Sequence, residues 1–349
     1  MRQPKTIVIA DDLTGALDSS VAFAGRGAKV VCALSSAHFS KALECGADVV
    51  AVSTNSRENK GLTAVYVLEG IIEMLSVEKL WSEVNVFLKV DSRLKGHVAA
   101  SIAALRGGFA AVRVSPAIPQ LGRLVKNGMV CGAGVAQPIP VAAQCGVPRE
   151  EAFDAQNMVD LEAIVASAPE RTLMVGAAGL ADAFAAHLMP EAAAQRIAQL
   201  PAPALFAIGS RDPITVAQLA DLRTIPAPNG QVPPMQAASD PLTVFQMTQG
   251  IEECSAPDAG AQFAQGVAAV ISQTAPATLL VCGGESAAAI LRLLDCGLLQ
   301  VEGEVLAGLP VSTLMDGRKG MRLITKSGGF GGPETLVQVA EKLVNSSET

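Results

Sequence analysis

Aromatic residues are scarce in this 349-residue sequence: they make up 3% of it, with a single tryptophan and a single tyrosine. Half of the residues are apolar and only 17% are charged, so the chain can bury a large core and disorder is not expected. A core of Ala, Val, Leu and Gly suits tightly packed α/β layers better than a β-sandwich. The length allows two domains of ordinary size.

Residues that bind metals or form disulfides are also few or unpatterned. The sequence has only three histidines, which argues against a His-rich zinc site. Its seven cysteines contain no Cys-x-x-Cys pair. An odd, scattered set of this kind is typical of reduced thiols, and it predicts a cytoplasmic protein.

Positive clusters and long apolar runs are missing as well. The formal net charge is −7, without an Arg-rich segment, so we expect no nucleic-acid partner. No apolar run reaches the ~20 residues of a membrane span, so no membrane partner is expected. The first residues lead straight into a predicted strand, which leaves no room for a signal peptide. The oligomeric state stays open, a homodimer included.

Acidic residues follow the first predicted strand. The apolar run over residues 7–10 ends in Asp11 and Asp12, and a helix-compatible segment begins just after them. This order places two carboxylates at the carboxyl edge of a parallel sheet, where open α/β sheets bind ligands. Burying them is costly unless they have a use. The alternative is that one aspartate only caps the following helix.

Two further predicted strands also end in polar residues. The strand over 48–53 is followed by Arg57. The strand over 85–90 contains Lys89 near its end and is followed by Asp91 and Ser92. Together with Lys95, these cations favour a small anionic ligand, because Arg and Lys are the usual donors to carboxylates. The alternative is that Arg57 and Lys89 only neutralise the nearby aspartates.

The second half repeats a strand–glycine–helix junction three times. Predicted strands over 205–208, 278–282 and 322–325 are each followed by glycine and a helix. Glycines let backbone N–H groups approach an anion, and helix N-termini favour negative charge, so these junctions predict phosphate binding. No junction matches the P-loop or the G-x-G-x-x-G dinucleotide pattern. The Pro-rich segment near residue 201 predicts a boundary between domains 1–200 and 201–349.

At this point the chain resembles a known family, the four-carbon acid sugar kinases. The resemblance covers most of the chain and rests on ordered motifs. They are Ile9-Ala-Asp-Asp-Leu-Thr-Gly-Ala16, Lys89-Val-Asp-Ser92 with Gly96, Pro116-Ala-Ile-Pro with Gly122-Arg123, Gly209-Ser210 with Pro213 and Thr215, Gly283-Gly284, and Thr325-Lys-Ser-Gly-Gly-Phe-Gly331.

The resemblance implies an α/β protein of two domains, each a largely parallel sheet flanked by helices, with the active site in the cleft between them. It implies an ATP-dependent kinase that phosphorylates a hydroxyl of threonate, erythronate or an oxo-tetronate. Mg²⁺ is expected from the chemistry of phosphoryl transfer, with ligands that the sequence does not identify.

The motifs also imply which residues form the sites. The residues that would orient or deprotonate the substrate hydroxyl are Asp11 and Asp12. The residues that would face the acid sugar are Asp11, Arg57, Lys89, Val90, Asp91 and Ser92. The residues that would face ATP are Ser210, Gly283, Gly284, Glu285, Ser286, Gly328 and Gly329, with Lys326 as a further candidate.

The sequence departs from the family pattern at two motifs. Glu285 and Ser286 stand where the family usually has Asp-Thr. Arg93 and Lys95 stand where it usually has Thr and Arg. The sugar acid is therefore not identified.

An alternative function is that of a sensor, which binds a sugar acid or nucleotide without catalysis. A phosphatase of the haloacid-dehalogenase type is disfavoured, because that family needs Asp-x-Asp. Adjacent side chains of an extended segment, such as those of Asp11 and Asp12, point apart.

Overall fold

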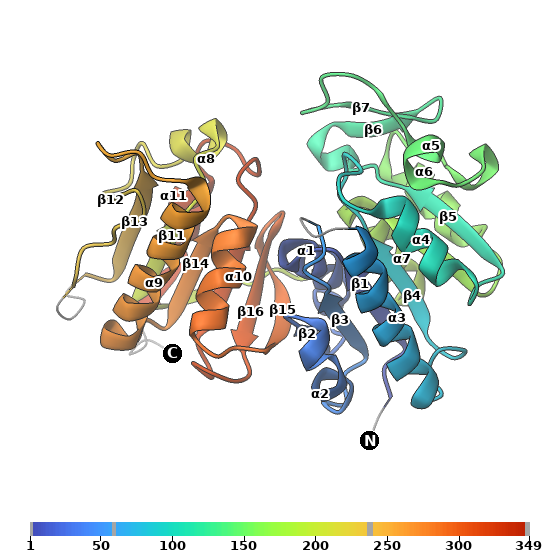
Figure 1. Cartoon of the computed structure of the whole chain (residues 1–349), viewed down its shortest axis with the longest axis horizontal. Helices are drawn as coiled ribbons and strands as arrows, with labels where there is room; N and C mark the ends of the chain where they lie inside the picture. The colour runs from blue at the N-terminus through green and yellow to red at the C-terminus, as the bar shows by residue number, and fades with distance from the viewer. Residues whose placement is uncertain (1–2, 58–60, 236–239, 346–349) are drawn as a thin grey trace. The chain divides into compact units, whose positions relative to one another are not determined.

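We describe the chain from a computed structural model, which covers residues 3–57, 61–235 and 240–345. The chain divides into two compact units, residues 1–194 and 195–349 (Figure 1). Each unit is an α/β domain, so the predicted fold class is confirmed.

The sheet of the first unit is built around β1 (Thr6–Ala10), a fully buried strand. Its order is β2 (Val30–Ala33), β3 (Val49–Ser53), β1, β4 (Asn85–Lys89), β9 (Thr172–Gly176) and β5 (Ala111–Ser115), with all neighbours parallel. β-branched residues fill β1 and β3, as expected for strands covered on both faces.

Helices cover this sheet, as the parallel strand order requires. They are α1 (Leu13–Ala24), α2 (Phe39–Leu43), α3 (Gly61–Val77), α4 (Val98–Arg106), α5 (Val141–Cys145), α6 (Met158–Ala166) and α7 (Ala178–Leu188). α7 packs against α1 and α6, whereas α3 packs against α4.

A small antiparallel sheet lies beside α5 and α6 in the first unit (Figure 1). It consists of β6 (Arg123–Lys126), β7 (Met129–Gly132) and β8 (Ile139–Pro140). The turn between β6 and β7 is Asn127-Gly128, both at positive φ, which is the usual chemistry of a tight hairpin.

The second unit has a sheet that is parallel in one part and antiparallel in the other. The parallel part has the order β12 (Ile225–Pro228), β13 (Leu242–Thr248), β11 (Ala204–Ile208), β14 (Thr278–Cys282) and β17 (Arg322–Lys326). The strands β16 (Leu309–Leu314) and β15 (Leu298–Leu306) continue it in antiparallel fashion. β10 (Leu200–Ala202) pairs separately with β18 (Leu343–Asn345).

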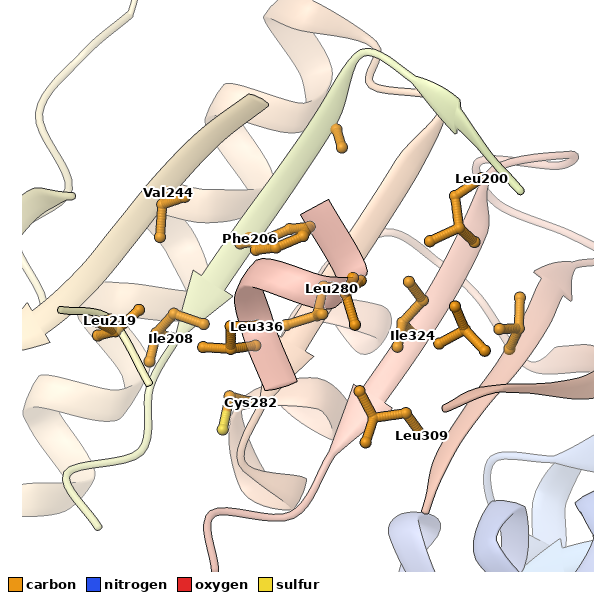
Figure 2. Close-up of a cluster of buried hydrophobic side chains, with 14 residues drawn as sticks. Leu200, Phe206, Ile208, Leu219, Val244, Leu280, Cys282, Leu309, Ile324 and Leu336 are labelled. Atoms are coloured by element: carbon orange, nitrogen blue, oxygen red, sulfur yellow. The ribbon is translucent and has the colours of Figure 1, made fainter. Parts of the chain in front are cut away.

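Four helices accompany this second sheet: α8 (Pro213–Ala217), α9 (Ala256–Thr274), α10 (Gly284–Leu293) and α11 (Thr335–Ala340). α9 and α10 lie side by side (Figure 1). On α11, Leu336 and Val339 pack onto Phe206, Leu280 and Ile324 from the three central strands (Figure 2). This apolar cluster fixes the strands β11, β14 and β17 next to one another, and the glycine junctions follow those three strands.

Candidate functional site

Sheet register brings the polar residues of the first unit together. Ala10, the last residue of β1, pairs with Ser53 of β3 and with Lys89 of β4. The chain after β3 stays close to β1, because the amide groups of Ser56 and Arg57 donate to the Asp11 carbonyl at 2.9 and 3.3 Å. Residues far apart in sequence therefore meet at one edge, as the sequence predicts.

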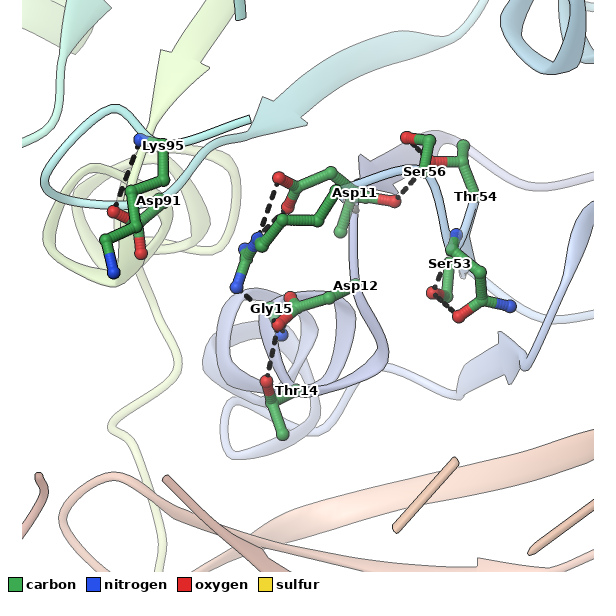
Figure 3. A network of polar contacts seen from close by, with 12 residues as sticks. Asp11, Asp12, Thr14, Gly15, Ser53, Thr54, Ser56, Asp91 and Lys95 are labelled. Atoms are coloured by element: carbon green, nitrogen blue, oxygen red, sulfur yellow. Dashed lines mark hydrogen bonds and ion pairs between the residues drawn. The ribbon is translucent and has the colours of Figure 1, made fainter. Parts of the chain in front are cut away.

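Arg57 forms ion pairs with both aspartates (Figure 3). Its Nε and Nη2 donate to Asp11 Oδ2 and Oδ1 at 2.9 and 2.7 Å, and its Nη1 donates to Asp12 Oδ2 at 2.7 Å. The two adjacent carboxylates thus reach the same guanidinium, although neighbouring side chains of an extended segment would point apart. These ion pairs are the contacts expected under the alternative in which Arg57 neutralises the two aspartates.

Asp12 is also the N-cap of α1. Its Oδ1 accepts from the Gly15 amide at 2.7 Å, and its Oδ2 accepts from the Thr14 hydroxyl at 2.8 Å. With the bond from Arg57, Asp12 accepts three hydrogen bonds, whereas the side chain of Asp11 accepts two, both from Arg57. Asp11 therefore keeps more acceptor capacity for a ligand.

The charges around Asp91 affect its protonation. Burial alone would raise the pKa of Asp91. The bond from the Arg93 amide at 2.8 Å and the charges of Arg57 and Lys89 instead hold that pKa below its usual range. Burial works against the charge of Arg57, but the hydrogen bond with Asp11 and the nearby carboxylates raise its pKa above the ordinary value. Both groups are ionised at neutral pH.

Lys89 is a buried cation whose ammonium group has no direct partner among the described residues. The residue is 6% exposed, and in the described part of the chain no acceptor lies within hydrogen-bond or ion-pair distance of its Nζ. A Cβ added to Gly15 would lie 3.0 Å from this Nζ, which places it over the first turn of α1. The charges of Asp91 and Asp18 act on this ammonium without contacting it, so its N–H groups are available to an anion.

Two other predicted acid-binding residues differ in their surroundings. Val90 is 3% exposed, and its amide donates to the Gly176 carbonyl at 2.9 Å as part of the sheet. Ser92 is hydrogen-bonded to the Nη1 of Arg123 on β6. Arg123 and its neighbour Arg93 are absent from the predicted site. Arg123 belongs to the Gly122-Arg123 motif of the family resemblance, and that motif could have been used to predict it as a site residue.

The three glycine junctions of the second unit are hydrogen-bonded to one another. The amides of Gly209 and Ser210 both donate to the Cys282 carbonyl at 3.1 Å, and the Gly283 amide donates to the Lys326 carbonyl at 2.9 Å. The hydroxyl of Thr215 donates to the Gly328 carbonyl at 2.6 Å. The predicted phosphate-binding segments therefore form one continuous group.

Two of these glycines cannot be replaced without strain. Gly283 has φ +114°, which L side chains rarely adopt, and it directly precedes the N-terminus of α10. A Cβ on Gly328 would lie 2.4 Å from the Ser210 hydroxyl oxygen. The backbone and Ser210 thus approach each other closely where a phosphate is expected.

The remaining predicted ATP residues lie at the same junctions. Gly284 is the first residue of α10, and Ser286 is buried with its Oγ close to Gly209. Glu285 is exposed in the first turn of α10. A Cβ on Gly329 would lie 3.7 Å from Asp212 Oδ2, while Asp212 Oδ1 caps α8.

Lys326 points into the domain. It is fully buried, and its Nζ contacts the carbonyls of Ser327 and Gly328 at 3.2 and 3.4 Å and the Thr215 hydroxyl at 3.3 Å. Burial lowers its pKa despite the nearby thiol of Cys282. These contacts support a role in shaping the glycine loop, and they give no support to the expected contact with phosphate.

A polar cavity of about 670 Å³ lies at the same edge of the second sheet. Its walls come from Arg211, just after β11, from Asn229, just after β12, and from residues 249–255, after β13. The Asn229 side chain holds the last of these segments, accepting from the Gly250 amide and donating to the Glu252 carbonyl, both at 2.8 Å. The cavity therefore lies on the β13 side of Ser210.

Over the described residues, no three His, Cys, Asp or Glu side chains gather so that they could hold a metal ion. None of the helices described here is long and apolar enough to cross a bilayer.

Comparison with protein families gives two matches along the chain. Residues 6–144 match a sugar-binding N-terminal domain, and residues 192–336 match a nucleotide-binding C-terminal domain. The charged group around Asp11 lies in the first match, and the three glycine junctions lie in the second.

Curated relatives match over nearly the whole length. A D-threonate kinase of Bordetella bronchiseptica is 28% identical, with 98% of each chain covered. A D-threonate kinase of Cupriavidus necator is 26% identical, with 97% of this chain and 98% of that one covered.

A solved structure shares the fold. It is a Salmonella typhimurium protein described as a tRNA synthase, with a TM-score of 0.77 and 17% identity over 95% of this chain and 98% of the other. At this identity the likeness shows the fold alone.

Proposed function

Because this chain belongs to the four-carbon acid sugar kinase family, we propose that it transfers the γ-phosphoryl group of ATP to a hydroxyl of a small sugar acid such as a threonate. The observation that carries the proposal is the pairing of two kinds of site in one chain. One is a group of charged side chains that includes the buried ammonium of Lys89, and the other is a group of three hydrogen-bonded glycine junctions.

The charges of the first unit favour an anionic substrate. Five cations surround the carboxyl edge of β1 and β4: Arg57, Lys89, Arg93, Lys95 and Arg123. Three carboxylates face them, those of Asp11, Asp12 and Asp91. A fourth, Asp18, is half-buried, and desolvation raises its pKa although the charge of Lys89 opposes this. The carboxylate of a bound acid would offset the excess of positive charge, because Arg and Lys side chains are the strongest hydrogen-bond donors to carboxylates.

In the proposed reaction Asp11 orients the substrate hydroxyl. Its carboxylate is fixed by two bonds from Arg57 and retains free lone pairs on both oxygens. Asp12 accepts three bonds and mainly holds the start of α1 and the position of Arg57. Phosphoryl transfer depends largely on positioning and on stabilising phosphate charge, so a fixed acceptor for the hydroxyl proton is sufficient.

The second unit would bind the triphosphate mainly through its backbone. The chain after β14 and β17 would supply the amide groups of Gly284, Gly328 and Gly329, whereas the amides of Ser210 and Gly283 already donate to the Cys282 and Lys326 carbonyls. The N-terminus of α10 adds a favourable dipole. The nucleoside would occupy the cavity beside Arg211 and Asn229, because that cavity continues the same sheet edge past Ser210.

Mg²⁺ bound to a nucleotide keeps several waters and needs only one or two protein carboxylates. The described residues fit this demand, since Asp212 and Glu285 stand at the glycine junctions. Either one would hold the ion, which neutralises charge on the phosphates. Lys89 would supply positive charge on the acid side of the reaction.

A coupled ADP-release screen with Mg-ATP and sugar acids of three to six carbons tests the proposal. We expect turnover with four-carbon acids and none with the matching polyols. Nucleotide binding without turnover of any acid would contradict the kinase proposal and would favour the sensor. Release of phosphate from phosphorylated sugar acids without ATP would indicate a phosphatase instead.

A further inference from the structure

Most of the N–H groups of Arg57 are already hydrogen-bonded, so few remain for a substrate carboxylate. A guanidinium carries five N–H groups in a fixed planar fork, and three of those of Arg57 already donate to Asp11 and Asp12. Turning the guanidinium toward a ligand would break these bonds and leave two aspartates without their cation. The acid end of the substrate therefore needs other donors.

Arg123 is a cation that has only neutral acceptors. On β6, its Nη1 bonds to the Ser92 hydroxyl, and its Nε donates to the Ala133 carbonyl at 3.0 Å. Burial and the charge of Arg93 lower the pKa of Arg123, and Asp91 opposes them only in part. The guanidinium is thus held in place beside another positive charge.

Arg93 lies next to Arg123, and among the described residues it also forms no ion pair with an acidic side chain. Its Nε is enclosed and has no hydrogen-bond acceptor, although an unpaired buried donor costs roughly 1–3 kcal/mol. Among the described residues neither Arg93 nor Arg123 takes part in an ion pair. Two neighbouring guanidinium groups that form no ion pair with a described carboxylate make a site that an anion would complete.

We propose that Arg93 and Arg123 together bind the carboxylate of the sugar acid, while Arg57 positions Asp11 and Asp12 for the hydroxyl. This assignment rests on the proposed kinase function and divides the substrate between two groups of residues. Arg93 stands at a position where the sequence departs from the motif of the family it resembles, so the acid-binding group is in part specific to this chain.

The test uses Arg123→Gln and Arg93→Gln in the full-length protein, with Lys126→Gln as the matched control. Lys126 lies on the same strand as Arg123 and is exposed, so the control removes one charge from the same hairpin. We expect each arginine variant to raise the KM for the acid about ten- to a hundredfold. The kcat at saturation and the KM for ATP should stay within about twofold, and the control should match wild type.

Calorimetric binding of the four-carbon acid and of its neutral polyol separates charge recognition from general damage. The arginine variants should lose affinity for the acid alone. Equal losses for acid and polyol would overturn the proposal, and so would a loss confined to kcat, which would place the arginines on the transferred phosphoryl group.

The same measurements keep the two proposals apart. If wild type turns over the acid and both variants do so equally well, the arginine assignment fails and the kinase stands. If wild type binds the acid without turnover and the variants lose that binding, the kinase fails and the assignment stands. If wild type binds no acid at all, both fail.

Discussion

The candidate sites of the two units are built from different parts of the chain. In the first unit the candidate groups are charged side chains, held by ion pairs such as those of Arg57. In the second they are mostly backbone amides, held by hydrogen bonds between strand ends. A site made of side chains can change its ligand through one substitution. A site made of backbone changes only if the fold around it changes.

The two buried lysines show the same contrast. Lys89 is 6% exposed, and its ammonium has no direct partner in the described chain, whereas Lys326 is fully buried and contacts two loop carbonyls and a hydroxyl. The ammonium of Lys89 acts on Asp91 and Asp18 only through its charge, so its N–H groups remain available to a ligand. The ammonium of Lys326 holds the glycine loop in place.

Lys89→Met should have the largest effect, and it should fall on the acid alone. Losing a charge-assisted hydrogen bond costs about 1.5–3 kcal/mol, so kcat/KM for the acid should fall up to about a hundredfold. The affinity for Mg-ATP should not change. The stability of the apo protein should change little, because the ammonium makes no hydrogen bond or ion pair with the described residues and an apolar chain of similar size replaces it. Steady-state kinetics, nucleotide titration and thermal melting check this, and equal losses for acid and ATP would break the contrast.

Gly328→Ala should disturb the backbone site in the opposite way. The added Cβ would lie 2.4 Å from the Ser210 Oγ and 3.4 Å from its Cβ, and overpacking of this kind costs about 1–3 kcal/mol. We expect ATP affinity to fall about tenfold while acid binding is kept. Ser210→Ala in the same chain removes the closest atom and should restore much of the loss, so a double-mutant cycle decides the cause.

Lys326→Met is the matched partner of Lys89→Met and should be milder. Its loss frees the carbonyls of Ser327 and Gly328, so the glycine loop becomes less well fixed. We expect the KM for ATP to rise about fivefold, from about 1 kcal/mol of lost hydrogen bonding, with the KM for the acid unchanged. A larger effect on the acid than on ATP would show that this lysine does not serve the nucleotide loop.

The smallest effect concerns acid stability. The folded-state pKa of Asp91 is lowered, so the stability it contributes is present above its unfolded pKa, about 3.9. It is lost as the pH falls through the lower folded value. Asp91→Asn should therefore flatten the decline of melting temperature below about pH 4. Parallel curves for variant and wild type would contradict the charge interactions proposed for Asp91.

Much of the fold follows from the sequence because its central strands are short apolar runs that end in polar or glycine residues. The strands expected over 7–10, 85–90 and 278–282 are present as β1, β4 and β14. β13 and the antiparallel pair β15 and β16 were not predicted, since neither ends in a recognisable motif. The segment 128–149 contains β7, β8 and α5, although its sequence, rich in Gly, Pro and Val, shows no clear periodicity.

The candidate site was predictable in composition but not in pairing. Sequence alone does not tell whether Arg57 faces a ligand or two aspartates, because that depends on the chain after β3 crossing beside Asp11. Arg123 was missed since its role depends on a hairpin reaching Ser92, 31 residues away in sequence. The domain boundary at 200/201 and a location of the active site between the domains stay predictions.

The hairpin that carries Arg123 has an evolutionary consequence. β6 to β8 form their own sheet and add no strand to the parallel one, so insertions and deletions there leave the main core intact. Changes in hairpin length would move one guanidinium relative to a fixed hydroxyl-binding group, and so select acids of different chain length. Grafting hairpins between relatives therefore offers a direct route to redesigning which acid is accepted.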